Sequence, residues 1–253
     1  MENKMIFRRR EVKYRLTRSQ AEELRWAMEP CMRPDPHGRS VIQSLYLDTP
    51  DFLLIRRSLE HPLYKEKLRL RSYGVAEGDT PVFLELKKKY KKVVYKQRVE
   101  LPLTEAEGYL RTGETRRDCQ IMREIDYCRR IYPALAPRML LSYRREAFFG
   151  RDNEDFRMTF DDEIRWRTKE LSLSAGIYGR RLLPEDTVLL EVKTAGGMPL
   201  WLARYLSARQ IYKTSFSKYG TAYQTWFGET QRRRIPDAGL LPRTIRREEY
   251  RYA

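Results

Sequence analysis

The sequence contains few of the residues from which metal centres and disulfide frameworks are built. Its 253 residues include only three cysteines and two histidines, and Cys31, Cys119 and Cys128 show none of the spacings of a zinc site. His37 lies in a segment rich in proline and glycine, and His61 precedes a proline, so both are expected in loops. We therefore expect free thiols in a reducing compartment.

Long apolar runs are missing as well. No stretch approaches the roughly 20 apolar residues that a membrane-spanning helix needs, and the N-terminal residues lack the apolar core of a signal peptide. The sequence therefore predicts a cytoplasmic protein, which a partner subunit can still hold at a membrane. Internal repeats and low-complexity tracts are also absent.

Acidic residues are outnumbered, since 51 lysines and arginines face 35 aspartates and glutamates, giving a formal net charge of +16. This excess predicts a polyanionic partner: nucleic acid, an acidic membrane or a phosphate-rich small molecule. An apolar fraction of 41% with 17 tyrosines is enough for a substantial core. We expect one domain over residues 1–230 and a basic tail over residues 231–253.

Three segments between residues 65 and 101 alternate charged and apolar residues with the period of two that marks a β-strand. Their apolar positions predict a face that packs on a core. The charged face is almost uniformly cationic, and adjacent like charges repel, so an anion is expected to offset the repulsion. Its members are Lys65, Lys67, Arg69, Arg71, Glu85, Lys87, Lys89, Lys96, Arg98 and Glu100.

The remaining pattern predicts five more strands and several helices. The strands are expected over residues 5–16, 41–48, 138–149, 156–164 and 187–194. Helices are expected over residues 17–29, 49–60, 104–132, 199–210 and 217–227, and a weakly paired loop over 171–186. The fold class is therefore α+β, with an eight-stranded antiparallel β-barrel and helices packed outside.

If these strands close into a barrel, one alternating face must line the lumen, and here that face is the charged one. The later strands add Tyr143, Arg145, Arg157, Thr159, Asp161, Glu191 and Lys193 to it. Phosphate chains suit such a basic tunnel, because arginine grips phosphate bidentately and lysine supplies a point charge. The carboxylates Glu11, Glu85, Asp161 and Glu191 either hold Mn²⁺ or Mg²⁺ beside phosphate oxygens or pair with neighbouring cations.

Nine fragments, in this order between residues 5 and 227, resemble the VTC domain. This is the catalytic polyphosphate polymerase domain of the vacuolar transporter chaperone complex, a branch of the triphosphate tunnel metalloenzymes related to the CYTH phosphatases. The resemblance implies an antiparallel tunnel that transfers the γ-phosphate of ATP to a growing polyphosphate chain with manganese or magnesium. The fragments are EVKYRL, SLYLDT, KLRLRSYG, FLELKKK, KQR, YRREAF, RMTFD, LLEVK and FSKYG.

The resemblance also implies roles for individual residues. Glu191 would be the metal ligand, and Ser217 and Lys218 of FSKYG would close on the phosphate at one mouth of the tunnel. The alternation pattern adds Lys67 and Lys193 to the phosphate-binding set, and Glu11, Glu85 and Asp161 as further metal candidates. The phosphate contacts that the resemblance implies come from Lys13, Arg69, Arg71, Lys87, Lys96, Arg98, Arg145 and Arg157, of which Arg69, Arg71, Lys87, Arg145 and Arg157 are the expected catalytic residues.

Two positions depart from the family patterns. Position 9 is arginine where CYTH members have the first glutamate of ExExK, which argues against a hydrolytic site with two metals. Ser215 stands where the eukaryotic polymerase domain has lysine.

Other functions stay open. One is a tripolyphosphatase or NTPase on the same fold, and another is a non-catalytic module that binds polyphosphate or inositol phosphates. Nucleic-acid binding fits the charge, but the sequence has neither a stacking pair of aromatics nor a recognition-helix motif. The resemblance further implies a membrane-embedded partner subunit.

Overall fold

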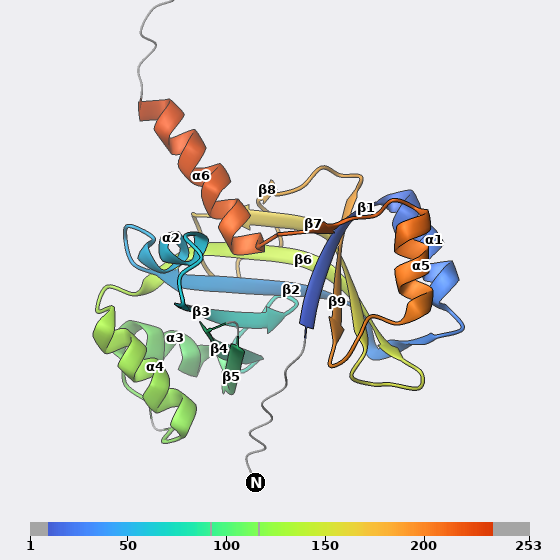
Figure 1. Ribbon diagram of the computed structural model, residues 1–253. Coiled ribbons are helices and arrows are strands. Elements are labelled where there is room, and N and C mark those ends of the chain that lie inside the picture. The colour runs from blue at the N-terminus through green and yellow to red at the C-terminus, as the bar shows by residue number, and fades with distance from the viewer. Residues whose placement is uncertain (1–9, 92, 116, 235–253) are drawn as a thin grey trace, which may run out of the picture.

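One antiparallel sheet of ten strands organises the protein (Figure 1). The computed structural model describes residues 10–91, 93–115 and 117–234. The strand order is β10-β1-β9-β7-β6-β2-β3-β4-β5, and β8 pairs with β7. The strands are β1 (Arg10–Thr17), β2 (Met32–Asp48), β3 (Tyr64–Tyr73), β4 (Pro81–Tyr90), β5 (Val93–Pro102), β6 (Ala136–Gly150), β7 (Arg157–Arg167), β8 (Arg180–Arg181), β9 (Thr187–Thr194) and β10 (Lys213–Thr214).

The eight long strands are those that the sequence predicts, so the α+β class and the antiparallel architecture are confirmed. The two extra strands, β8 and β10, have two residues each. Strand β2 begins nine residues before the predicted start, because the segment with Pro34 pairs with β6 across a register shift between Pro34 and Arg39. A bulge of this kind lets a strand continue through residues that otherwise favour a turn.

The sheet curls so that β1 and β9 run across the direction of β2 and β6 (Figure 1). Its hydrogen-bonded ladder stays open, however, since β10 and β5 are its two ends and no pairing joins them within the described residues. The free edge of β1 is taken by β10, through the pairs Lys13–Thr214 and Tyr14–Lys213. The tunnel expected from the sequence is therefore barrel-like, but hydrogen bonds between strands do not close it.

Strand register places the predicted cations on one face. Lys67 of β3 lies opposite Lys87 of β4, which lies opposite Lys96 of β5. The next rank inward along these strands is Arg69, Glu85 and Arg98. Cross-strand partners point to the same side of a sheet, so both ranks share the concave face.

The opposite face is apolar and covered by helices, as predicted. Helices α3 (Leu103–Thr112) and α4 (Gln120–Ile131) pack on Leu68, Leu70 and Leu84, which are completely buried. Burying each such leucine stabilises the fold by roughly 1.5–3 kcal/mol. Two further apolar clusters form under α1 (Arg18–Met28) with α5 (Leu200–Ala208), and under α2 (Leu53–Leu59) with α6 (Lys218–Arg234).

Some of the predicted helix boundaries are confirmed and others are wrong. Thr17 caps α1, because its Oγ1 accepts from the Gln20 amide at 3.1 Å while the Gln20 side chain accepts from the Thr17 amide at 3.0 Å. The long helical segment expected over residues 104–132 is two helices, and α3 begins at Leu103 without a side-chain cap. Helix α6 runs to Arg234, and the basic tail beyond it lies outside the described residues.

Candidate active site

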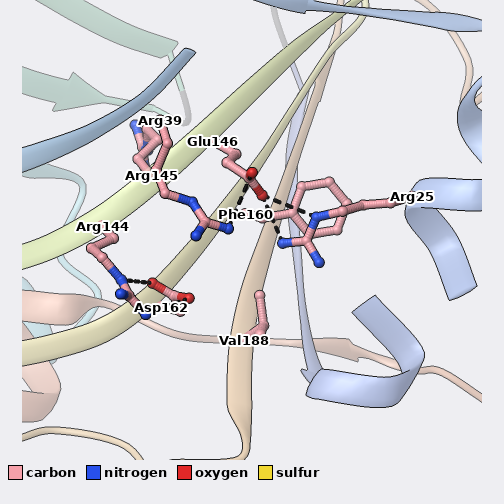
Figure 2. A pocket seen from close by; sticks show the side chains of 8 residues that line it. All are labelled: Arg25, Arg39, Arg144, Arg145, Glu146, Phe160, Asp162 and Val188. Atoms are coloured by element: carbon pink, nitrogen blue, oxygen red, sulfur yellow. Dashed lines mark hydrogen bonds and ion pairs between the residues drawn. The ribbon is translucent and has the colours of Figure 1, made fainter. Parts of the chain in front are cut away.

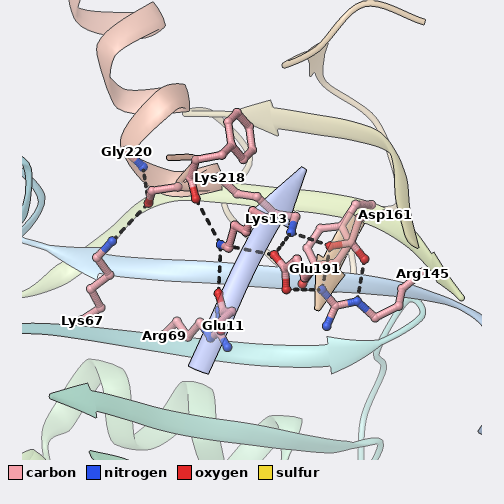
Figure 3. Close-up of polar contacts among 12 residues, drawn as sticks. Glu11, Lys13, Lys67, Arg69, Arg145, Asp161, Glu191, Lys218 and Gly220 are labelled. Carbon is pink, nitrogen blue, oxygen red and sulfur yellow. Dashed lines mark hydrogen bonds and ion pairs between the residues drawn. The ribbon is translucent and has the colours of Figure 1, made fainter. Parts of the chain in front are cut away.

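Glu191 of β9 is the centre of a buried ion-pair network (Figure 3). Its Oε1 lies 2.8 Å from the Nζ of Lys218 and 3.3 Å from the Nζ of Lys13, and its Oε2 lies 3.3 Å from Nη2 of Arg145. These cations come from α6, β1 and β6, segments far apart in the sequence. The tertiary fold alone brings them to one carboxylate.

Asp161 of β7 extends this network. Both of its carboxylate oxygens accept from Arg145 at 2.6 Å, and Lys218 lies 2.5 Å away. Burial raises the pKa of Glu191, but Lys218, Lys13 and Arg145 outweigh burial and hold it well below its usual range. Burial lowers the pKa of Lys218, whereas Asp161 and Glu191 raise it above its ordinary value. We call Glu11, Lys13, Arg145, Asp161, Glu191 and Lys218 the Glu191 network.

Glu11 connects this network to the strands on the far side of the concave face, and we call the space that this face encloses the lumen. Its Oε1 lies 3.1 Å from the Nζ of Lys13. Burial raises the pKa of Glu11, but Lys13 on its own strand and Lys87 on β4 bring the pKa below its ordinary value. Strands β1 and β4 are not hydrogen-bonded to each other, so the influence of Lys87 on Glu11 indicates that the two strands face each other across the concave side of the sheet.

Glu85 of β4 is the centre of a second network, which carries excess positive charge. Its Oε2 lies 2.7 Å from Nε of Arg69 and 3.8 Å from Nε of Arg71, and its Oε1 lies 2.7 Å from the Nζ of Lys96. Burial raises the pKa of Glu85, but Arg69, Arg71 and Lys96 lower it to about 2. One carboxylate therefore faces three cations, and an anion bound here would relieve their repulsion.

Three lysines in the lumen are costly to keep charged. Burial lowers the pKa of Lys96 to about 8, although Glu85 opposes the shift. Burial lowers the pKa of Lys67 to about 8, although the interaction with Tyr46 raises it. Burial likewise lowers the pKa of Lys193 to about 8, although Glu191 and Glu11 oppose the shift. Desolvated ammonium groups of this kind gain most from a multivalent anion, because it replaces the lost hydration with charge-assisted hydrogen bonds.

The segment before α6 closes over the network from above (Figure 3). Lys13 donates from Nζ to the carbonyl oxygen of Phe216 at 3.1 Å, and Lys67 donates to Oγ of Ser217 at 3.3 Å. The amide of Gly220 also donates to this Oγ at 3.1 Å, as at a helix N-cap. Periodicity gives no signal for this segment, and the family motif FSKYG alone predicted that Ser217 and Lys218 lie at the site.

Three predicted residues share the lumen face but make other contacts. Arg98 stacks over the ring of Phe83, with its Cζ 4.8 Å from the ring centroid. Arg157 stacks over Phe149 at 4.8 Å and lies 3.3 Å from a carboxylate oxygen of Asp35. Lys87 is solvent-exposed between Lys67 and Lys96 in the strand register.

Side chains of β2 complete the lumen, although the sequence pattern did not predict them as site residues. Nη1 of Arg69 donates to the hydroxyl of Tyr46 at 3.1 Å, and Nε of Arg71 donates to Oγ of Ser44 at 3.3 Å. Burial raises the pKa of Tyr46, but Arg69 and neighbouring cations lower it to about 8. The run SLYLD looks like an ordinary buried strand, and only the alternation of Ser44, Tyr46 and Asp48 marks its polar face.

An arginine-rich pocket lies on the other side of the sheet from Asp161 (Figure 2). Arg144 pairs with Asp162 at 2.9 Å, one residue from the Arg145–Asp161 pair, so the two pairs point to opposite faces of the sheet. Arg25 and Arg39 contact the two oxygens of Glu146 at 2.8 and 3.1 Å. Acids already neutralise these arginines, so this outer pocket carries less excess positive charge than the surroundings of Glu85.

The residues present fit a divalent cation held by one or two carboxylates. The described part of the chain contains no group of three or more His, Cys, Asp or Glu side chains arranged for a metal. Glu191 and Glu11 share Lys13, and Glu191 contacts Arg145 through one oxygen at 3.3 Å. Asp161 accepts from Arg145 through both oxygens at 2.6 Å, and Glu85 is buried against Arg69. Magnesium and manganese commonly use few protein carboxylates and complete their shell with phosphate oxygens. Glu191, with Glu11 beside it, is the donor set that fits.

Comparisons with known proteins agree with this fold. The family model of the VTC domain matches residues 8–227. A Bacillus halodurans protein assigned as an adenylate cyclase superposes with a TM-score of 0.51 at 15% identity, over 82% of this chain and 92% of its own. A Hippeastrum protein assigned as an adenylyl cyclase, for which a dominant triphosphatase activity is described, superposes with a TM-score of 0.51 at 15% identity, over 85% and 95%. At this identity the likeness shows the fold alone. A search of curated proteins found no match.

Proposed function

Because the chain belongs to the VTC domain family, we propose that it is a divalent-metal-dependent phosphotransferase that extends polyphosphate with the γ-phosphate of ATP. The observation that carries the proposal is the convergence of cations from β1, β3, β5, β6 and α6 on Glu191 and Glu85 within one lumen. Its substrates are ATP and polyphosphate or triphosphate.

The charge distribution supports a substrate with several adjacent phosphates. Three cations surround the carboxylate of Glu85, so this group has excess positive charge. In the Glu191 network the numbers of acidic and basic side chains are equal. We assign the reacting phosphoryl group to the space between them, where Arg69, Arg71 and Lys96 neutralise charge on one side and Arg145 and Lys218 on the other. Guanidinium groups hold phosphate oxygens in a fixed fork, which favours alignment of donor and acceptor.

The proposed reaction needs positioning and charge neutralisation more than a general base. A terminal phosphate oxygen of the polyphosphate chain attacks the γ-phosphorus of ATP, the bond from that phosphorus to the β,γ-bridging oxygen breaks, and ADP leaves with the electron pair. Arg145 and Lys218 stabilise the developing charge. A manganese or magnesium ion at Glu191 and Glu11 would supply further neutralisation of the phosphate oxygens when bound.

Incubation of the protein with ATP and manganese, followed by electrophoresis of the products, tests this proposal. A ladder of polyphosphate that lengthens with time, and that Glu191→Gln abolishes, is the expected result. Phosphate release without a ladder would assign the site to a tripolyphosphatase or NTPase instead. Tight binding of tripolyphosphate without any product, unaffected by Glu191→Gln, would leave a binding module for polyphosphate or inositol phosphates.

We propose that residues 1–230 form the functional unit and act in the cytoplasm, held at a membrane by a membrane-embedded partner subunit. In the part of the chain that the structure describes, no helix has both the length and the apolar composition needed to cross a bilayer. Pull-down of detergent-solubilised membranes with residues 1–230 is the direct test, because the proposed subunit should be retained without the tail.

A further inference from the structure

Exposed aromatic and aliphatic side chains gather where β3 begins and the β4–β5 hairpin turns. Tyr64 and Tyr90 are direct cross-strand partners, and Tyr95 lies opposite Lys88 on the same outer face. Leu63 precedes this pair and is 73% exposed. We call Leu63, Tyr64, Tyr90 and Tyr95 the hairpin patch.

Helix α4 extends the patch but does not cover it. Glu124 of α4 accepts from Lys88 at 2.9 Å and from Gln97 at 3.0 Å, which seats the helix beside the outer face of β4 and β5. Tyr127 and Ile131, on the following turns of α4, are 58% and 49% exposed. An uncovered group of large apolar side chains on one end of a domain is typical of an interaction surface.

The charges around the patch are cationic. Lys91 lies over the ring of Tyr90 with its Nζ 5.3 Å from the centroid. Lys65 and Lys89 are cross-strand partners at the same end of the hairpin and project from its opposite face. The nearby acids are largely engaged inside the fold, since Glu66 accepts from the Tyr64 hydroxyl at 2.9 Å and is almost completely buried. An exposed acid, Glu60, precedes the patch.

We propose that the hairpin patch docks on a membrane surface rich in anionic lipid. Tyrosine rings favour the boundary between acyl chains and headgroups, and lysines beside them are attracted to anionic headgroups while their alkyl stems lie on apolar surface. The match of tyrosines and lysines on a hairpin turn favours a lipid surface over a protein groove. This docking uses the end of the hairpin and not the Glu191 network or the cations around Glu85, so it does not depend on the proposed reaction.

Co-sedimentation with phosphatidylserine-containing vesicles, compared with vesicles of phosphatidylcholine alone, tests the proposal. The double variant Tyr90→Ser/Tyr95→Ser removes two exposed rings, and Trp26→Ser on α1, 77% exposed, is the matched control on another side of the molecule. We expect the double variant to bind phosphatidylserine vesicles about tenfold more weakly than wild type, with Trp26→Ser unchanged. Lys91→Glu should weaken binding by about fivefold or more, whereas Lys213→Glu on β10 should not.

Four outcomes would overturn the proposal. If wild type does not bind phosphatidylserine vesicles, or if the double variant binds them as tightly as wild type, the patch does not contact lipid, and any binding follows from net charge alone. If sedimentation instead reveals a concentration-dependent dimer that the double variant abolishes, the patch is a contact between two copies of the chain. Equal losses in Trp26→Ser and the double variant would contradict the assignment to this surface.

Discussion

The Nζ of Lys218 lies 2.8 Å from Oε1 of Glu191, so the first residue of α6 neutralises the central carboxylate of β9. The same ammonium group lies 2.5 Å from Asp161. Helix α6 is thereby tied to the lumen through its N-terminus, while its aromatic side chains pack near α2. The position of α6 and the charge state of the Glu191 network therefore depend on each other.

Replacing Lys218 tests this dependence. Lys218→Met leaves Asp161 and Glu191 with less compensation in a buried setting, so the free energy of unfolding should fall by about 3 kcal/mol. Urea unfolding monitored by tryptophan fluorescence measures the change. Lys213→Met, an exposed lysine on β10, is the matched control and should shift the free energy by less than about 0.5 kcal/mol. Equal effects of the two variants would contradict the coupling.

Two adjacent arginines provide a test of which face binds phosphate. Arg145 pairs with Asp161 on the lumen face, and Arg144 pairs with Asp162 on the outer face. Arg145→Lys loses the bidentate fork, so the affinity for tripolyphosphate should fall by about tenfold or more, whereas Arg144→Lys should leave it unchanged. Isothermal titration calorimetry measures both affinities. A loss in Arg144→Lys alone would place the anion in the outer pocket.

The buried lysines predict that binding depends on pH. Lys67, Lys96 and Lys193 have pKa values of about 8, so all three lose charge as the pH rises through 8. A bound polyanion favours their protonated form, so binding takes up protons near pH 8 and the affinity for tripolyphosphate falls from pH 7 to pH 9. Calorimetry in buffers of different ionisation enthalpy counts the protons. Lys67→Met should reduce the uptake, and a proton count that this variant leaves unchanged would contradict the assignment.

The same pKa values predict how stability without ligand changes with pH. The folded pKa of Lys67 lies below its ordinary value of 10.5, so between pH 8 and 10.5 the unfolded chain binds more protons at this site than the folded protein does. The contribution of Lys67 to stability therefore rises with pH over that window. Comparing the slope of unfolding free energy against pH for wild type and Lys67→Met isolates this contribution, and the variant should have the smaller slope.

The sequence pattern predicts the face on which each charged side chain lies, because successive side chains of a strand always alternate between the two faces of the sheet. It predicts that Lys67 and Arg69 share a face because they are two residues apart on one strand. The observed register confirms that Lys96 of the neighbouring hairpin lies on the same face. It does not predict that the ladder stays open, because that depends on which distant segment takes the free edge of β1. Tyr46 is missed for a similar reason, since its role depends on Arg69 from another strand.

Glu85 provides the last test, because it is the one carboxylate among Arg69, Arg71 and Lys96. Glu85→Gln keeps the shape of the side chain and removes its charge, which leaves three cations facing one another in a buried site. Removing one partner from a buried ion pair costs about 3–5 kcal/mol, so the melting temperature of the free variant should fall markedly. Tripolyphosphate supplies the missing negative charge and binds only the folded state, so it should raise the melting temperature of Glu85→Gln more than that of wild type. Differential scanning fluorimetry with and without tripolyphosphate measures both shifts.

Glu100→Gln, on the same face of β5, is the control and should respond like wild type. If tripolyphosphate stabilises Glu85→Gln no more than wild type, the anion does not bind between these cations, and the reacting phosphoryl group must lie elsewhere in the lumen.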